Sequence, residues 1–279
     1  MKRARWSVTL LLTLCGLFAK PKVATATDIS GEIDSTLTIT ENSKLVGDVL
    51  CTVTGGSCIS FGASGIGLRL NGHTMTGLGA RDSCPSPDEA GHGIDDGGQA
   101  NVSIDGPGLI RGFQGDGILL TGTTNHVFAV VVASSCANGI EIQGSGNSVF
   151  RVTVVRASLA GMFDAGILVQ GDGRNYVSGS VIVDASNLPA PGGHGVVILS
   201  SNNSLYQNNV SGNPGAGIFI LDGATGNTIT SNSAFGNRIY HDIFDDNAPG
   251  SNSFVNNSCE LSGGNNAPAC PAVGPPPPN

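Results

Sequence analysis

The sequence predicts an all-β protein, a parallel solenoid of about eight or nine coils, and two repeated features predict it. A glycine followed by an apolar residue recurs every 22 to 29 residues. An asparagine follows each step 8 to 10 residues later and opens a run of alternating apolar and polar residues. A repeat this short cannot bury an apolar face alone, so each copy must stack on the next. The steps begin at Gly93, Gly117, Gly139, Gly166, Gly195, Gly217 and the degenerate Asp242, and the asparagines are Asn101, Asn125, Asn147, Asn175, Asn203, Asn227 and Asn252.

The chain starts with the features of a secretory signal peptide. A basic start is followed by an apolar stretch over residues 6–19 and by the small-residue pattern Ala24-Thr25-Ala26. The apolar stretch is shorter than the roughly 20 residues that a membrane span needs. We therefore expect cleavage of residues 1–26, no remaining membrane span, and a secreted or periplasmic product.

The charge left after cleavage is strongly negative. The leader holds five of the 13 basic residues and no acidic residue, which leaves eight basic against 21 acidic residues, a net charge of −13. Nucleic acids and anionic membranes are poor partners for such a chain, because phosphate binding needs clustered lysine and arginine.

The region between the leader and the tail reads as strands. The residue two places after each asparagine from Asn125 onward is apolar, and a period of two places alternate side chains on one face. Leu37-Thr38-Ile39-Thr40 alternates in the same way and is expected to begin the stack, within N-terminal capping coils. We expect one β-helix domain over 27–262 and a monomer. The tail over 263–279, which ends in four prolines, is expected to be disordered.

A second set of asparagines lies five places after the first in the last three copies. Asn208, Asn232 and Asn257 stand at this position. Stacked asparagines at a turn can hydrogen-bond along the stack. The sequence therefore predicts an asparagine ladder here.

The segment Leu68-Arg69-Leu70-Asn71-Gly72-His73-Thr74-Met75-Thr76-Gly77 resembles one near the start of many right-handed parallel β-helix proteins of the pectate-lyase-like superfamily. The repeats over about 60–258 are most similar to those of NosD-type β-helix proteins. The resemblance implies a single-stranded right-handed parallel β-helix. It implies no single activity, because this superfamily includes lyases, hydrolases, epimerases and adhesins.

Six cysteines remain after cleavage, and an even count in an exported chain favours disulfide bonds. Six cysteines allow fifteen pairings. Two pairs are close enough in sequence to form local bridges, and the third pair is what remains. We expect Cys51–Cys58, Cys259–Cys270 and Cys84–Cys136.

The spacing of the repeats varies mainly at one corner of the coil. Extra residues collect between Arg156 and Ala165 and between Asp184 and His194, and the loop over 78–92 enters the same corner. Loops on a rigid scaffold commonly carry function. The residue before each glycine forms a column at this corner, which we call the corner column: His92, Asp116, Asn138, Ala165, His194, Ala216 and His241.

The corner column is a candidate site, although solvated turn residues would give the same pattern. Its densest part joins His92 and Asp116 to the pair Asp95 and Asp96. Carboxylates there could bind Ca²⁺ or serve as general acid and base, and we expect Asp96 and Asp116 to lie outside the core. The candidate binding residues are His92, Asp95, Asp96, Arg111, Asp116, Asn138, Asp164 and His194, of which Asp95, Asp96 and Asp116 are the metal candidates.

Another column, three places after the corner column, should face outward. We call it the strand column: Asp95, Leu119, Glu141, Leu168, Val197, Phe219 and Phe244. Its last four members form an apolar stripe, which marks a partner surface or a face covered by the chain itself. The tail after Cys259 is the expected cover.

The segment Gly192-Gly193-His194-Gly195-Val196 resembles the Gly-His-Gly segment of polygalacturonase-type hydrolases, but the paired carboxylates of that family are missing. We therefore expect an exported protein that binds an extracellular or cell-surface polysaccharide. The alternatives are a polysaccharide lyase, epimerase or glycoside hydrolase acting at the loop-rich corner, and a structural surface or adhesion module.

Overall fold

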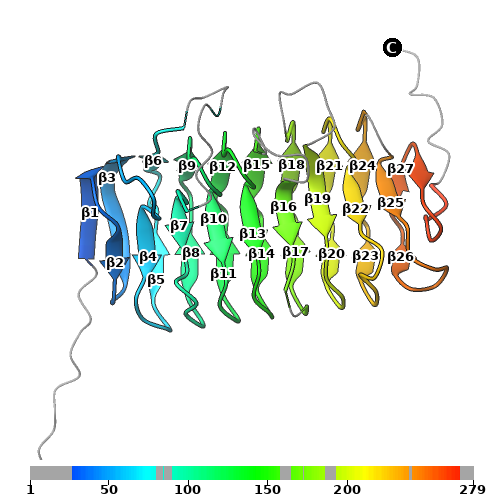
Figure 1. Ribbon diagram of the computed structural model, residues 1–279, viewed down its shortest axis with the longest axis horizontal. Helices are drawn as coiled ribbons and strands as arrows, with labels where there is room; N and C mark the ends of the chain where they lie inside the picture. The colour runs from blue at the N-terminus through cyan, green and yellow to red at the C-terminus, as the bar shows by residue number, and fades with distance from the viewer. Residues whose placement is uncertain are drawn as a thin grey trace, which may run out of the picture.

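The computed structural model describes residues 27–79, 84, 90–157, 165–171, 173–185, 193–238 and 241–270. It shows a parallel β-solenoid whose coils stack along one axis (Figure 1). The signal peptide expected over 1–26 and the proline run at the end of the chain lie outside the described residues, as does most of the three corner loops. No helix in the described part of the chain is long and apolar enough to cross a membrane.

One face of the solenoid is a ten-stranded parallel sheet with one strand per coil. Its strands are β2 (Leu37–Ile39), β4 (Ile59–Phe61), β7 (Ile94–Asp95), β10 (Ile118–Leu120), β13 (Ile140–Ile142), β16 (Ala165–Val169), β19 (His194–Ile198), β22 (Ile218–Ile220), β25 (Ile243–Asp245) and β28 (Ser262–Gly263). As expected, β2 begins this stack.

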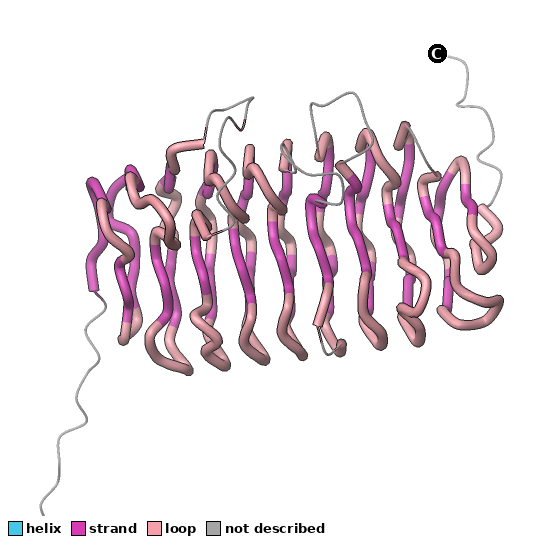
Figure 2. The backbone as a smooth tube through the Cα atoms, viewed as in Figure 1, coloured by secondary structure: helices cyan, strands magenta, loops and turns pink. Residues whose placement is uncertain are grey.

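The remaining strands form an 18-stranded sheet that contributes two strands to each coil (Figure 2). It starts with β1 (Thr27–Ile33) and β3 (Ser43–Cys51). The first row is β5 (Gly67–Arg69), β8 (Ser103–Asp105), β11 (His126–Phe128), β14 (Ser148–Phe150), β17 (Tyr176–Ser178), β20 (Ser204–Tyr206), β23 (Thr228–Thr230) and β26 (Ser253–Val255). The second row is β6 (Thr74–Thr76), β9 (Leu109–Arg111), β12 (Val131–Ala133), β15 (Thr153–Val155), β18 (Val181–Val183), β21 (Asn209–Ser211), β24 (Ser233–Phe235) and β27 (Ser258–Cys259).

These strands make eight successive three-strand coils, which start at β4, β7, β10, β13, β16, β19, β22 and β25. The predicted fold class is therefore confirmed. The apolar residues of the Gly-apolar steps pair with one another from coil to coil, and all are fully buried. They are Ile94, Ile118, Ile140, Ile167, Val196, Ile218 and Ile243.

Buried asparagines hold the coils together at the turns, and two of these turns carry the asparagines singled out from the sequence. At the first turn, each backbone N–H from Asn125 to Asn227 donates to the side-chain oxygen of the asparagine one coil further on, at 2.8 to 3.1 Å. At the second turn, Asn208 and Asn232 donate in the same way to Asn232 and Asn257. The predicted ladder at the second turn is confirmed.

Asn101 is the exception to the predicted register. The residue that donates to Asn125 Oδ1 is Val102, so the ladder position in this coil belongs to valine. Asn101 lies one place earlier, exposed, with a positive φ of 55°. The turn before Val102 is one residue longer than the spacing suggested, and asparagine tolerates the left-handed conformation found at position 101.

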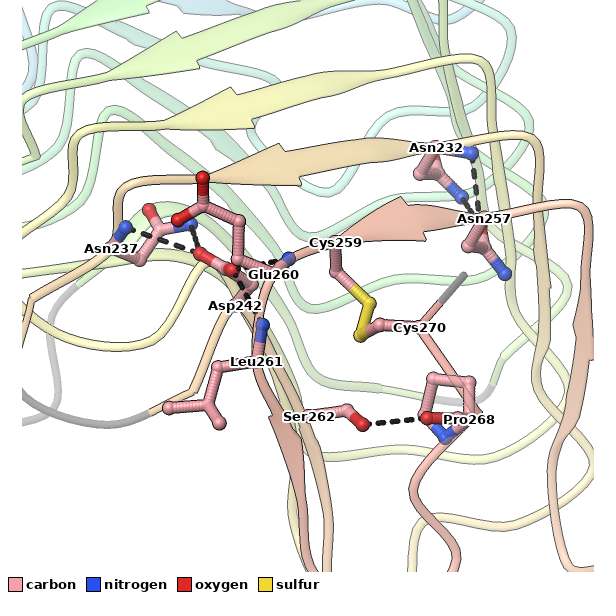
Figure 3. The surroundings of a disulfide bond; sticks show 10 residues. All are labelled: Asn232, Asn237, Asp242, Asn257, Cys259, Glu260, Leu261, Ser262, Pro268 and Cys270. Carbon is pink, nitrogen blue, oxygen red and sulfur yellow. Dashed lines mark hydrogen bonds between the residues drawn. A yellow bond between two sulfur atoms is a disulfide. The ribbon is translucent and has the colours of Figure 1, made fainter. Parts of the chain in front are cut away.

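All three expected disulfides are present: Cys51–Cys58, Cys84–Cys136 and Cys259–Cys270. The last bridge fastens the chain beyond the final coil (Figure 3). In this segment β28 pairs with β25, and the Ser262 hydroxyl donates to the Pro268 carbonyl at 2.6 Å. The packed structure thus continues past residue 262, the expected end of the domain, to Cys270.

Candidate functional site

The corner column and the strand column lie side by side on the outer face of the ten-stranded sheet. Residues three places apart touch across them: Asn138 Nδ2 lies 3.1 Å from Glu141 Oε2, and the His241 ring centroid lies 5.6 Å from that of Phe244. The face is polar toward the N-terminal coils and apolar toward the C-terminal ones. Most of the corner column is buried, whereas Asp95 and Glu141 of the strand column are half-buried.

The polar half contains a connected set of side chains that we call the acidic cluster: His92, Asp116, Asn138 and Glu141. Asp116 Oδ1 accepts from both the backbone N–H and the side-chain amide of Asn138, at 2.8 and 3.0 Å. The same amide donates to Glu141, so Asn138 bridges two carboxylates. Asn138 is itself fixed, because its oxygen accepts the Ala165 N–H at 2.9 Å.

Glu141 is the centre of the hydrogen bonding in this cluster. Its Oε1 accepts from Gln143 Nε2 at 2.6 Å and also from Gln170 Nε2. Burial, and after it the charge of Asp116, raises the pKa of Glu141 above its usual value of 4.5, although the two glutamine amides act to lower it. A carboxyl group of this kind holds its proton to a higher pH than an exposed glutamate does.

His92 faces Asp116 through a single nitrogen. Its Nδ1 lies 3.1 Å from Asp116 Oδ2 and 3.1 Å from the Asp116 backbone nitrogen. The neutral ring accepts the backbone N–H, and the protonated ring donates to the carboxylate, so the nitrogen exchanges partners on titration. Burial acts to lower the pKa of His92, but the Asp116 hydrogen bond and the charges of Asp116, Asp95 and Glu141 outweigh it, and the pKa is raised above 6.5.

Asp95 and Asp96 do not act together. Asp95 belongs to the strand column, is half-buried and accepts the Gly97 N–H at 2.8 Å. Asp96 turns inward and is 0% exposed. The expectation that Asp96 and Asp116 lie outside the core is wrong, since Asp116 is only 2% exposed.

The Asp96 carboxylate is saturated by the turn that surrounds it. Oδ1 accepts from the N–H groups of Gly98 and Thr121 and from the Thr121 hydroxyl, at 2.8 to 3.0 Å. Oδ2 accepts from the Gly122 N–H at 2.9 Å and from Asn125 Nδ2 at 2.6 Å. Five donors therefore share the two oxygens of Asp96. The carboxylate joins two coils and holds Asn125, the first asparagine of the ladder.

The other candidate residues do not join the acidic cluster. Arg111 lies on β9, in the second row of the other sheet, where its Nε donates to Thr76 Oγ1 at 3.3 Å. His194 is in the corner column but four coils further along, and Asp164 lies outside the described residues. His194 is 4% exposed, and burial lowers its pKa to about 4.

The apolar half of the face is not covered by the described tail. Leu168 and Val197 are buried although they belong to the outward column. The strand that follows Cys259, β28, pairs with β25 and so extends the rod at its end. The tail therefore adjoins only Phe244, the last member of the stripe, and the expectation that it lies along the stripe is wrong for the residues described.

Glu141 is the functional candidate that the sequence reasoning missed. It belongs to the strand column but was not singled out there, because its neighbours in that column are leucines. The signal that could have found it is its position three places after Asn138, in the same outward register. Gln143 and Gln170 became visible as its partners only through the pairing of β13 with β16.

Residues 87–267 match the family model of NosD, described as a periplasmic copper-binding protein. The chain belongs to the NosD family. No curated protein sequence matches it. A periplasmic family and three disulfides are both consistent with an exported protein.

Solved structures with the same fold have sequences far from this NosD-family chain. The tailspike protein gp208 of Dettilon has a TM-score of 0.61 at 16% identity over 81% of this chain, which spans 46% of the tailspike. The A-module of the mannuronan C-5 epimerase of Azotobacter vinelandii has a TM-score of 0.46 at 11% identity, covering 87% of this chain and 86% of the module. A periplasmic alginate epimerase has a TM-score of 0.43 at 13% identity, covering 77% and 62%. These likenesses concern the fold alone.

The described residues do not fit the copper that the NosD description implies. Copper in proteins is held by imidazole, thiolate and thioether groups. The described cysteines are all disulfide-bonded, and Met75 is buried in the core. Within the described ranges, no group of three or more His, Cys, Asp or Glu side chains is arranged to hold a metal ion.

Proposed function

We propose that this protein is exported and binds a polysaccharide along the outer face of its ten-stranded sheet. The observation that carries the proposal is the alignment of the acidic cluster with an aromatic segment on one rigid face. In that segment the Phe219 and Phe244 rings stack at 5.3 Å with an interplanar angle of 3°. Sugar chains offer both hydroxyl groups and apolar ring faces, and this face supplies partners for each.

The geometry favours a chain-like ligand. Side chains in one column repeat about every 4.8 Å along the rod, because neighbouring strands of a sheet have that spacing. Carboxylates and amides that accept and donate hydrogen bonds suit neutral sugar hydroxyls. Asp95, Asp116 and Glu141 would repel an anionic chain on this face.

Acid–base catalysis on the same ligand is the second candidate function, and one observation favours it. The pKa of Glu141 is raised while Asp116, a second carboxylate, lies in hydrogen-bond contact with it. Two carboxyl groups whose environments differ are the usual basis for separate acid and base roles. A lyase, epimerase or hydrolase would use Glu141 as the acid and His92 or Asp116 as the base.

The test measures thermal unfolding of the purified protein with a panel of neutral and acidic polysaccharides. A bound polysaccharide should raise the melting temperature, because it stabilises only the folded state. The double variant Glu141→Gln, Gln143→Ala should lose that rise, and Glu32→Gln, an exposed acid at the N-terminal end, should keep it. A rise that persists in the double variant, or no rise with any polysaccharide, would overturn the proposal.

The same samples decide between binding and catalysis. If the protein only binds, no reducing ends or unsaturated sugar products should appear. If it is a hydrolase or lyase, the wild-type protein should form these products and Glu141→Gln should not. Epimerisation leaves no such products, so the recovered polysaccharide is also analysed for its sugar composition.

A further inference from the structure

A second face of the rod carries an unusual concentration of aromatic side chains. In the first row of the 18-stranded sheet, each three-residue strand points its first and third side chains outward. Four of the eight outward positions on the consecutive strands β11, β14, β17 and β20 are Phe or Tyr, in a chain with only 5% Phe, Trp and Tyr, and a fifth is a histidine. The eight, which we call the aromatic face, are His126, Phe128, Ser148, Phe150, Tyr176, Ser178, Ser204 and Tyr206.

The rings of the aromatic face form a platform that is open to solvent. The Phe128 and Phe150 rings stack with centroids 5.7 Å apart, and the His126 ring lies 6.2 Å from Phe128. On the next two coils Tyr176 and Tyr206 are each 38% exposed. Buried aromatic area stabilises a fold, but rings left half in water are available to a ligand.

A buried hydroxyl lies within this platform. The register places Ser178 between Phe150 and Tyr206 in one outward column. Ser178 is only 2% exposed, and its Oγ has no hydrogen-bond partner among the described residues. A buried hydroxyl without a partner costs free energy, which a ligand that supplies the hydrogen bond would recover.

The charge of the aromatic face is opposite to that of the acidic cluster. None of its eight outward residues is acidic, and two guanidinium groups flank it at opposite ends of adjacent strands. Arg151 follows Phe150, with its guanidinium carbon 4.8 Å from the centre of that ring, and Arg174 stands two places before Tyr176. Both arginines are exposed, and neither pairs with an acid among the described residues.

We propose that the aromatic face is a binding surface for an acidic saccharide, one that contains uronic acid units. The rings stack on the sugar faces, Arg151 and Arg174 bind carboxylates, and Ser178 hydrogen-bonds a sugar hydroxyl. Nucleic acid also stacks on rings, but two arginines on a chain of net charge −8 are too few for a polyphosphate. The surface is separate from the acidic cluster and does not depend on the function proposed for it.

The test is calorimetric titration of the purified protein with a hexameric oligogalacturonate, a neutral cello-oligosaccharide of equal length and a single-stranded oligonucleotide. The oligogalacturonate should bind most tightly. Tyr176→Ala and Tyr206→Ala should each weaken it roughly tenfold, the size expected for a lost stacking contact. Arg151→Gln with Arg174→Gln should remove the preference for the acidic over the neutral sugar.

Two controls keep this surface distinct from the acidic cluster. Thr228→Ala with Thr230→Ala, on β23 of the same row, should leave oligogalacturonate binding unchanged, and so should Glu141→Gln. Loss of binding in Glu141→Gln, unchanged binding in both tyrosine variants, tighter binding of the oligonucleotide, or no binding of oligogalacturonate would each overturn the inference.

Discussion

His92 and His194 occupy equivalent positions in the corner column, and the Asp116 carboxylate lies 3.1 Å from Nδ1 of His92. Each Nδ1 accepts the backbone N–H of the next residue in the column, which is Asp116 for His92 and Ala216 for His194, at 3.1 and 3.0 Å. Burial lowers the pKa of His194 to about 4. Burial also acts to lower the pKa of His92, but the hydrogen bond and charge of Asp116, with the charges of Asp95 and Glu141, raise it above 6.5.

His194 should make the fold sensitive to acid. Its folded pKa of about 4 lies below the ordinary 6.5, so the unfolded chain binds the proton first and stability falls as pH decreases between these values. The full effect corresponds to roughly 3 kcal/mol. In His194→Gln, which keeps an acceptor for Ala216, urea unfolding should lose less stability between pH 7 and pH 4.5 than wild type. The half-buried His126→Gln is the control, and an equal loss in both variants would contradict the assignment.

Asp116 should control the titration of His92. In Asp116→Asn the carboxylate is gone while the burial remains, so the pKa of His92 should fall from its wild-type value. Histidine NMR signals followed against pH measure this directly. An unchanged His92 pKa in the variant would show that Asp116 is not its partner in solution.

Asp96→Ala should destabilise the protein far more than Asp95→Ala. The first change leaves the buried Gly122 N–H and one hydrogen of the buried Asn125 Nδ2 without an acceptor, at about 1–3 kcal/mol for each group that water cannot reach. The neighbouring Asp95 is half-buried on the outer face, so its loss should cost little. Chemical denaturation of the two variants compares them, and similar midpoints would mean that the Asp96 turn is not structural.

Asn232→Ala should weaken the second ladder. Its side chain accepts the Asn208 N–H and donates to the Leu205 carbonyl, at 2.9 and 3.0 Å, and all three residues are buried. Removing it should cost about 1–3 kcal/mol. Asn209→Ala, an exposed asparagine on β21, should cost less than 0.5 kcal/mol, as surface changes usually do. Thermal unfolding monitored by circular dichroism gives both values.

The sequence by itself determined the features that repeat. The strand register, including Ile118 and Val127, and the ladder through Asn232 could be predicted because every coil must satisfy the same burial and hydrogen-bonding needs, which leaves a periodic pattern. The two local disulfides could be expected because their cysteines are close in sequence. Single departures from the period, such as Asn101, could not be predicted. One extra residue in a turn moves the next side chain, here Val102, into the ladder position.

The tertiary structure alone decided the features that depend on contacts between coils. Adjacent aspartates, Asp95 and Asp96, read as a pair, but the strand ends between them and directs one outward and the other into a turn. Glu141 gains its raised pKa from burial and then from Asp116, 25 residues earlier. The direction in which a polar side chain points, and how far it is buried, depend on the side chains and backbone groups of the neighbouring coil. That information is absent from any one repeat, so the acidic cluster and the aromatic face emerged only once the coils were stacked.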